Sequence, residues 1–534
     1  MGNRSGQAVV LAYVTVLVLT VLGGSLLTHS FTARQHSQIR ELHTDVFYMA
    51  EGGIEAASSR FAVDIANFQV SATVARYPAA GSIITNFADG GVASTVIVEA
   101  EPTQRTIIDP DGVSVFVKNY HVTTTVQHPQ NAGVAVTMHQ IVARKIVYAF
   151  QHAVFYDGDL EWLPGPDMTL SGRVHSNNNI YLGANNLLTI DSEYLRAMGQ
   201  IFNRRKDDNS RPSGIVQIRK AGTGQYAAMD GLDSASPTWT SESQTRWLGT
   251  VKSGVHGVQR RAVPLVGSIA PGGFYDSNAD VKIVNGTITD RSGNPLVVPP
   301  GTVRTTTTFY NNREGKWVQM TEIDLRKLSG YADGDLPGSP SFPNRLPPNG
   351  LIYTTNSGVP SSQEPGVRLV NGAEIGRAGG LTVVSNAPIY IQGDFNTVAK
   401  KPAAVIGDAV NLLSNNWNDA NSNAGVSSRP ATQTTINTAF IAGIDTTSAG
   451  RYNGGLENYP RLHENWGGQE LRIRGSFVSL WNSQVATGYW QYGNPQYTAP
   501  IRNWSYEGSF SDGANLPPFT PWSVEMAKGA WWKD

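Results

Sequence analysis

The residues with the clearest capacity for chemistry lie in SGRVHSNNNIYLG, residues 171–183, where His175 is followed directly by Ser176. An imidazole beside a hydroxyl could form a nucleophilic pair in which the histidine takes the serine proton. The three asparagines at 177–179 are also typical of a tight turn, because Asn tolerates left-handed backbone angles and bonds its own chain. Whether the chain is an enzyme depends on which of these descriptions holds.

A second copy of this segment favours the turn. GGLTVVSNAPIYIQGDFNT, residues 379–397, repeats the Ser-Asn pair and the following Ile-Tyr-aliphatic strand, but it has Val384 in the place of His175. A scaffold element that carries a histidine in only one copy predicts a structural role for that histidine. Such strand–turn units could stack as a β-helix or short solenoid, although an ordinary array needs three or more repeats.

An acidic cluster near residue 160 could bind a cation. Asp157, Asp159, Glu161 and Asp167 offer oxygen ligands of the kind that calcium prefers, but they lack the alternating acidic ladder of a calcium loop. We expect a solvated turn and leave calcium binding at Asp157–Asp159 open. Paired carboxylates for glycoside hydrolysis cannot be selected from sequence, because the two partners can lie far apart in the chain.

The composition excludes several other kinds of site. The chain has no cysteine, so it has no disulfides, thiolate zinc sites or cysteine nucleophiles. The pair His463-Glu464 lacks the second histidine of a zinc helix. A formal net charge of −1 argues against a nucleic-acid partner, which needs a basic face. We therefore predict a protein that is not an enzyme, with no catalytic residue, no metal and no cofactor.

The N-terminus predicts one long helix over residues 7–66. Segment 8–27 contains no charge and matches the ~20 residues that cross a bilayer as a helix. Segment 28–66 is amphipathic, and steps of three and four residues form one apolar stripe. Its positions are Ile39, Leu42, Val46, Ala50, Ile54, Ala57, Phe61 and Ile65. Two glycine pairs, Gly23-Gly24 and Gly52-Gly53, are expected points of bending or close helix contact.

This N-terminus resembles that of a type IV prepilin. A short leader, residues 1–6, contains Arg4 and ends in a glycine, and the segment AEGGIEAA at 50–57 is similar to one in PilX-like minor pilins. The resemblance implies that a prepilin peptidase cuts between Gly6 and Gln7 and that the helix packs with other pilins. The positions expected to contribute to that packing are Leu11, Gly23, Gly24, Glu51, Gly52, Gly53 and Glu55.

Leu11 departs from the family pattern. Pilins usually carry Glu at the fifth mature position, where an otherwise costly mid-bilayer carboxylate meets a neighbour's terminal amine. PilX-type proteins and the K-type minor pseudopilin of type II secretion also lack this Glu, so the resemblance implies a minor or tip subunit. The alternative is a plain single-span anchor.

The rest of the chain is predicted to be mostly β-structure. Residues 67–152 read as an antiparallel meander laid on the amphipathic helix, 153–430 as a β-rich head with strand–turn repeats and loop insertions, and 431–534 as a tryptophan-rich β region. The predicted fold class is α+β, with a pilin-like helix and sheet below a head of β-helix-like character. The tryptophans either fill a core or form a ligand surface. They are Trp466, Trp481, Trp490, Trp504, Trp522, Trp531 and Trp532.

These features predict a tip-located minor pilin or pseudopilin of a type IV pilus or type II secretion-like filament. Its expected partners are other pilins, the prepilin peptidase, the bacterial inner membrane before assembly, and a surface or carbohydrate ligand of the head. Its expected location is the inner membrane, with the C-terminal part outside the cytoplasm, and then the pilus or cell surface. The rival hypothesis is a surface carbohydrate-binding protein, or a carbohydrate-active enzyme, that uses a pilin-like anchor.

Overall fold

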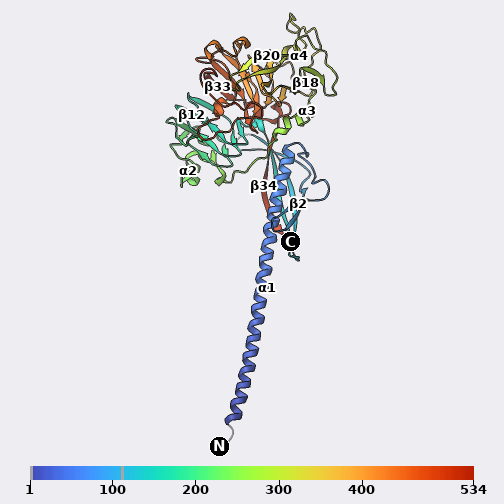
Figure 1. The fold of residues 1–534 in the computed structure, drawn as a ribbon, viewed down its shortest axis with the longest axis vertical. Coiled ribbons are helices and arrows are strands. Elements are labelled where there is room, and N and C mark those ends of the chain that lie inside the picture. Colours follow the sequence, from blue (N-terminus) through green and yellow to red (C-terminus); the bar gives the residue numbers. More distant parts are fainter. Residues whose placement is uncertain (1–3, 110–112) are drawn as a thin grey trace.

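A computed structural model describes residues 4–109 and 113–534 and confirms the α+β class. One long N-terminal helix, α1 (Arg4–Ala66), is followed by a large β-rich part. Figure 1 shows the helix projecting from a first sheet, with the head, residues 153–521, at the end of the molecule opposite the N-terminus. The C-terminus lies beside the helix at the lower end of the first sheet (Figure 1).

Helix α1 packs on the first sheet through one apolar face. Val46, Ala50, Ile54, Ala57, Phe61 and Ile65 are each at most 3% exposed, as the stripe in the sequence predicts. Ile39, the first position of the stripe, is instead 44% exposed. The face is buried only where the sheet lies beside the helix, so the amphipathic segment is longer than the part that packs.

The first sheet is antiparallel, and within the described residues it has seven strands in the order β1-β3-β5-β6-β34, with β2 on β3 and β4 on β5. Val, Ile and Thr alternate between its two faces, as a half-buried strand requires. The strands are β1 (Arg76–Tyr77), β2 (Ile83–Asn86), β3 (Val92–Glu99), β4 (Arg105–Ile108), β5 (Ser114–His128), β6 (Asn131–Tyr148) and β34 (Trp522–Lys533).

Strand β34 ties the end of the chain to its beginning. It pairs antiparallel with β6 from Trp522 opposite Tyr148 to Lys533 opposite Met138. Residues 431–534, expected to form one region, thus divide between the head and the first sheet. The head is consequently joined to the first sheet at both of its ends, through β6 and through β34.

The head is built on an 11-stranded sheet whose order is β17-β13-β10-β7-β32-β29-β26-β24-β22-β18-β19 among the described residues. Its neighbours are parallel apart from the β18–β19 pair. The strands are β7 (Val154–Tyr156), β10 (Val174–Ser176), β13 (Leu195–Ala197), β17 (Val251–Lys252), β18 (Val281–Val284), β19 (Thr287–Asp290), β22 (Leu351–Thr355), β24 (Leu381–Ser385), β26 (Ala403–Gly407), β29 (Ala439–Ala442) and β32 (Phe477–Ser479).

The strand order shows that the head is wound in two halves. The chain stacks outward from β7 to β17, then continues at the opposite end with β18 and stacks back to β32, which pairs with β7. The seam between the first and the last turn of chain therefore lies in the middle of the sheet.

Further strands form the other sides of the stack. They are β8 (Leu160–Trp162), β9 (Met168–Ser171), β11 (Ile180–Leu182), β12 (Leu187–Asp191), β14 (Ile201–Phe202), β15 (Ile215–Arg219), β16 (Tyr226–Ala228), β20 (Val303–Asn311), β21 (Lys316–Asp324), β23 (Gln363–Val370), β25 (Ile389–Gln392), β27 (Val410–Leu413), β28 (Thr434–Asn437), β30 (Arg461–Leu462), β31 (Glu470–Gly475) and β33 (Ile501–Tyr506). Short helices α2 (Trp239–Trp247), α3 (Phe274–Asn278) and α4 (Leu325–Leu328) interrupt them.

The two sequence repeats occupy equivalent corners of this stack. Each begins in a strand of the 11-stranded sheet, β10 or β24, and continues into β11 or β25. In both corners the serine hydroxyl accepts a hydrogen bond from the backbone N–H two residues on: Ser176 from Asn178 and Ser385 from Ala387, each at 3.0 Å. The Ser-Asn pair is thus a turn that the fold uses twice.

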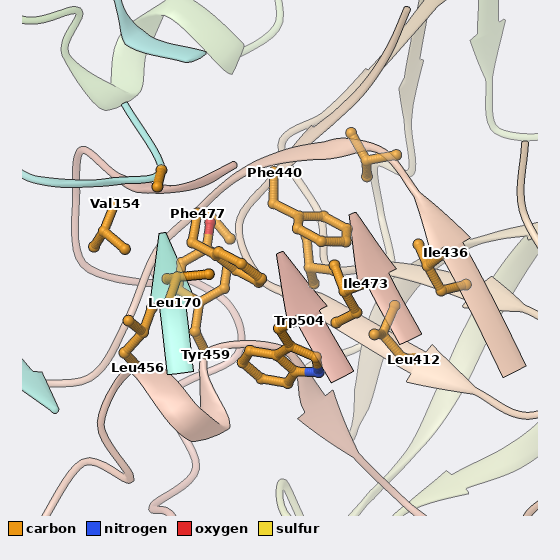
Figure 2. Close-up of a cluster of buried hydrophobic side chains, with 14 of the residues drawn as sticks. Val154, Leu170, Leu412, Ile436, Phe440, Leu456, Tyr459, Ile473, Phe477 and Trp504 are labelled. Carbon is orange, nitrogen blue, oxygen red and sulfur yellow. The ribbon is translucent and has the colours of Figure 1, made fainter. Parts of the chain in front are cut away.

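The centre of the head is an apolar core that includes part of the tryptophan-rich region. Figure 2 shows Trp504 beside Phe477, Ile473 and Tyr459. The Trp504 and Phe477 rings are stacked with centroids 5.1 Å apart. Trp466 is fully buried, whereas Trp531 is 54% exposed. The tryptophans therefore serve different purposes, and at least Trp466 and Trp504 are core residues.

A glycine sets the distance between helix α1 and the sheet. A Cβ built on Gly53 would lie 2.7 Å from the Ala93 Cβ and 2.9 Å from the Thr124 Cγ2. We expect Gly53→Ala to force the helix away from the sheet and to lower the free energy of unfolding by about 1–3 kcal/mol. Thermal unfolding of the purified protein in detergent micelles measures this loss.

Gly24→Ala is the matched control for that substitution. No described atom lies within 4 Å of a Cβ built there, and replacing a helix glycine by alanine stabilises a helix by about 1 kcal/mol. Equal unfolding temperatures for the two variants would show that the contact at Gly53 does not limit the packing of the helix.

Candidate functional site

The feature that most requires a functional explanation is the N-terminal half of α1. Among the described residues 4–109 and 113–534, one helix, spanning Gly6–Ala66, is long and apolar enough to cross a membrane. The described residues do not cover its apolar side chains before residue 28: Leu11 is 70% exposed, Leu19 62% and Leu26 70%. Each buried aliphatic side chain contributes about 1.5–3 kcal/mol, so leaving this segment in water would be very costly.

The polar side chains of this segment are also suited to an apolar environment. Thr15 and Thr20 each donate a hydroxyl hydrogen bond to the backbone carbonyl four residues earlier, at 2.8 Å. Thr28 and Thr32 do the same at 2.9 Å. Because a hydroxyl that bonds within its own helix needs no water, this surface can enter lipid or a helix bundle.

The predicted processing and packing positions are all accessible at the start of the helix. Gly6 and Gln7 lie in the first turns of α1 and are exposed. Leu11 projects from the helix, and no described atom lies within 4 Å of a Cβ built on Gly23 or Gly24. This part of the helix is therefore free for the cleavage and packing predicted from sequence, both of which stay predictions.

The second group of predicted positions lies against the chain's own sheet. Gly52 and Gly53 approach Phe87 and Ala93, so this glycine pair allows close contact with the first sheet of the same chain. Glu51 and Glu55 are exposed, and Glu55 forms an ion pair with Lys528 of β34. The pair Gly52-Gly53, expected to be a point of bending or close helix contact, therefore lies where the helix contacts the sheet of the same chain.

His175 is a buried residue of a strand and does not belong to the turn that follows. It is 1% exposed in β10, and its ring is stacked on Phe155 with centroids 5.1 Å apart. Burial, reinforced by the nearby positive charge of Arg261, holds the pKa of His175 well below its usual range. The Ser176 hydroxyl donates to the Gly158 carbonyl at 2.8 Å, so the two side chains do not form a nucleophilic pair.

We expect His175→Val, which inserts the residue of the equivalent corner, to fold with a loss of about 1–3 kcal/mol. The loss comes from the ring stack and from the 3.2 Å contact with the Asn177 Oδ1. Thermal unfolding measures the stability of the variant, and surface labelling of cells measures its display on the cell surface. The reverse exchange, Val384→His, should lower the stability more. Val384 packs among apolar side chains, so the new imidazole would bury a ring nitrogen that has no hydrogen-bond partner. Normal stability with loss of display would indicate a functional role for His175.

The acidic cluster is mostly neutralised by its neighbours. Asp157 pairs with Arg260 and Asp159 with Lys206, both at 2.7 Å, and Asp167 accepts from Asn186. Within the described parts of the chain, no group of three or more His, Asp or Glu residues could hold a metal ion. Glu161 differs from these residues: it is 1% exposed, and among the described residues its carboxyl group interacts with the Thr447 side chain and not with an ion-pair partner.

Comparison with known proteins adds little to this description. No family model matches the sequence, and no curated protein matches it. The solved structures include the crystal structure of the competence-associated pilin ComZ from Thermus thermophilus, which is 9% identical over 92% of this chain and 97% of that chain, with a TM-score of 0.26. At that TM-score the likeness supports no conclusion about fold or function.

Proposed function

We propose that this chain is a minor pilin or pseudopilin-like subunit of a type IV pilus or type II secretion-like filament and is not an enzyme. A prepilin peptidase removes residues 1–6, and segment 8–27 holds the precursor in the bacterial inner membrane with the head outside the cytoplasm. The mature helix then leaves the membrane and packs with the helices of other pilins. The PilX-like resemblance of the N-terminus is the source of these details.

The observation that carries the proposal is the exposed apolar half of α1. A helix that merely crossed the membrane would need only segment 8–27, but residues 28–41 continue as an exposed helix before packing begins. At 1.5 Å per residue this adds roughly 20 Å between the apolar segment and the sheet. A helix that extends beyond both the membrane and its own domain has room to pack with neighbouring helices.

The position of the head supports a place at or near a filament tip. Figure 1 shows it at the far end of the molecule from the N-terminus, wider than the helix and sheet beneath it. Subunits packed against the lower helix are not obstructed by it, whereas a subunit stacked above it would collide with the head.

We expect Leu11→Glu to reduce incorporation into filaments at least ~10-fold. A tip subunit has no neighbouring amine to pair with the new carboxylate, which then carries a cost of up to ~3 kcal/mol in an apolar environment. Immunoblots of sheared filaments, normalised to membrane-bound protein, measure incorporation in a strain that has the assembly machinery.

Leu11→Ile is the control, because it keeps the position apolar and should be incorporated normally. Equal incorporation of Leu11→Glu, evenly distributed along filaments, would contradict the tip assignment. If the parent protein stays in the membrane and never enters filaments, the rival hypothesis is favoured: a surface carbohydrate-binding protein, or a carbohydrate-active enzyme, that uses a pilin-like anchor.

A further inference from the structure

A polar cavity of about 330 Å³ opens at the seam where the first and last turns of the head meet. Its walls come from the β7–β8 corner (157–161), from the loop after β29 (444–447) and from the segment after β32 (479–482). The Asp157 N–H donates to the Ser479 carbonyl at 2.8 Å across this seam. The cavity therefore exists only because the two halves of the head join there.

A second, smaller chamber lies next to this cavity. It has a volume of about 10 Å³, roughly enough for one water molecule. Glu161, Ile444, Asp445 and Asn453 line both spaces, so the two spaces adjoin at these residues. The chamber is a recess in which a single hydroxyl group would fit.

Two buried polar groups line the smaller chamber. Among the described residues, the Tyr156 hydroxyl has no hydrogen-bond partner, and the Glu161 carboxyl group has the Thr447 side chain as its hydrogen-bonding neighbour. Glu161 is 1% exposed and Tyr156 is 2% exposed. Because an unsatisfied buried polar group is unfavourable, a ligand or water atom that forms hydrogen bonds with both groups would be favoured.

Three acidic side chains around the outer cavity are already paired with basic ones, so they do not favour the binding of an ion. Asp157 is paired with Arg260, Asp159 with Lys206, and Asp445 with Arg313, each at 2.7 Å. Burial raises the pKa of Glu161 to about 7, and Thr447 and Lys206 offset this only in part. Near pH 7 Glu161 is therefore only partly ionised, and its protonated form can donate a hydrogen bond as well as accept one.

The remaining lining offers neutral hydrogen-bonding groups and an aromatic ring. Asn178, Asn482 and Thr446 provide amide and hydroxyl groups, and Trp481 provides an indole whose N–H has no described partner. Apolar rings combined with a few fixed polar groups are typical of sites that bind small molecules. A sugar matches this combination, since it has an apolar face and several hydroxyls.

We propose that this cavity binds one or two residues of a neutral saccharide, with the ring in the outer cavity and one hydroxyl in the chamber between Glu161 and Tyr156. The inference specifies the carbohydrate ligand that the sequence leads us to expect for the head, and it involves no bond cleavage. It concerns residues far from helix α1, so it can fail while the filament proposal stands.

Binding of neutral mono- and disaccharides to the full-length protein in detergent micelles tests this inference by isothermal titration calorimetry, following a printed glycan array. We expect at least one neutral saccharide to bind the parent protein. Tyr156→Phe removes only a hydroxyl and should weaken that binding about 10-fold, because a site built for a hydroxyl loses its partner. Glu161→Leu should weaken it at least as much.

Tyr353→Phe is the matched control. Tyr353 is an equally buried tyrosine of the head that does not line the cavity, and its hydroxyl donates to the Ile269 carbonyl at 3.0 Å. Binding by this variant should equal that of the parent protein. If Glu161→Leu does not fold, the isosteric Tyr156→Phe still tests the site.

Three results would overturn the inference. They are the absence of any saccharide binding by the parent protein, binding that both Tyr156→Phe and Glu161→Leu leave unchanged, and binding of calcium ions with no saccharide bound. In the first case the chamber holds water only. None of these measurements requires filaments, so they do not depend on processing or assembly.

Discussion

Deletion of residues 522–534 is expected to unfold the first sheet and to free the C-terminal part of helix α1. Strand β34 covers the edge of β6 and also contacts the helix: Val524 is 1% exposed, and the Trp522 indole N–H donates to the Ile65 carbonyl at 3.1 Å. Removing several such side chains at about 1.5–3 kcal/mol each costs more than about 5 kcal/mol, which is comparable to the whole stability of an ordinary domain.

Hydrogen exchange of residues 46–66 measures this effect directly, because their amides are protected only while the helix packs on the sheet. Deletion of residues 530–534 alone is the control, since Trp531 and Trp532 are 54% and 42% exposed and lie beyond the irregularity in the β34–β6 pairing. That shorter deletion should leave most of the protection intact. Full protection of 46–66 after the longer deletion would show that β34 is dispensable for the fold.

Gly6→Val is expected to abolish maturation and to remove the protein from filaments. If the resemblance to prepilins holds, the peptidase requires the small residue that ends the leader, and a branched side chain at Gly6 blocks the cut. The uncut leader retains the charge of Arg4, and a charged side chain costs about 2.5–3.5 kcal/mol in the middle of a bilayer. The helix cannot then pack among other apolar helices.

Gly2→Val is the matched control for that variant, because it makes the same change inside the leader but away from the junction. Immunoblots of membranes and of sheared filaments separate precursor from mature protein. We expect Gly2→Val to mature normally and Gly6→Val to accumulate as precursor in the membrane. Normal incorporation of Gly6→Val would contradict leader processing at this junction.

Local patterns in the sequence predict the helix and the corners of the head well. The stripe from Val46 to Ile65 is buried as expected, because its spacing matches the helical period. The Ser-Asn turns at 176 and 385 also follow from sequence, since each serine hydroxyl binds a backbone amide only two residues away. In these cases the interaction that fixes the structure is short in range.

Long-range pairings could not be predicted in the same way. Alternation within 522–533 indicates a strand but does not name its partner, and β34 pairs with β6 far back in the chain. The pairing of β32 with β7 also joins segments that lie far apart in the chain. No local pattern in the sequence therefore predicts the cavity at this seam. The asparagines after His175 indicate a turn, but the place of His175 beside Phe155 depends on the pairing of β10 with β7.

The measurement that tests the central claim most directly is the mass of the mature N-terminal peptide, obtained from protein isolated from cells that carry their own assembly machinery. If the chain is a processed filament subunit, mass spectrometry will find a protein that begins at Gln7. A mature protein that begins at Met1, or at a residue beyond Ala33, would contradict it.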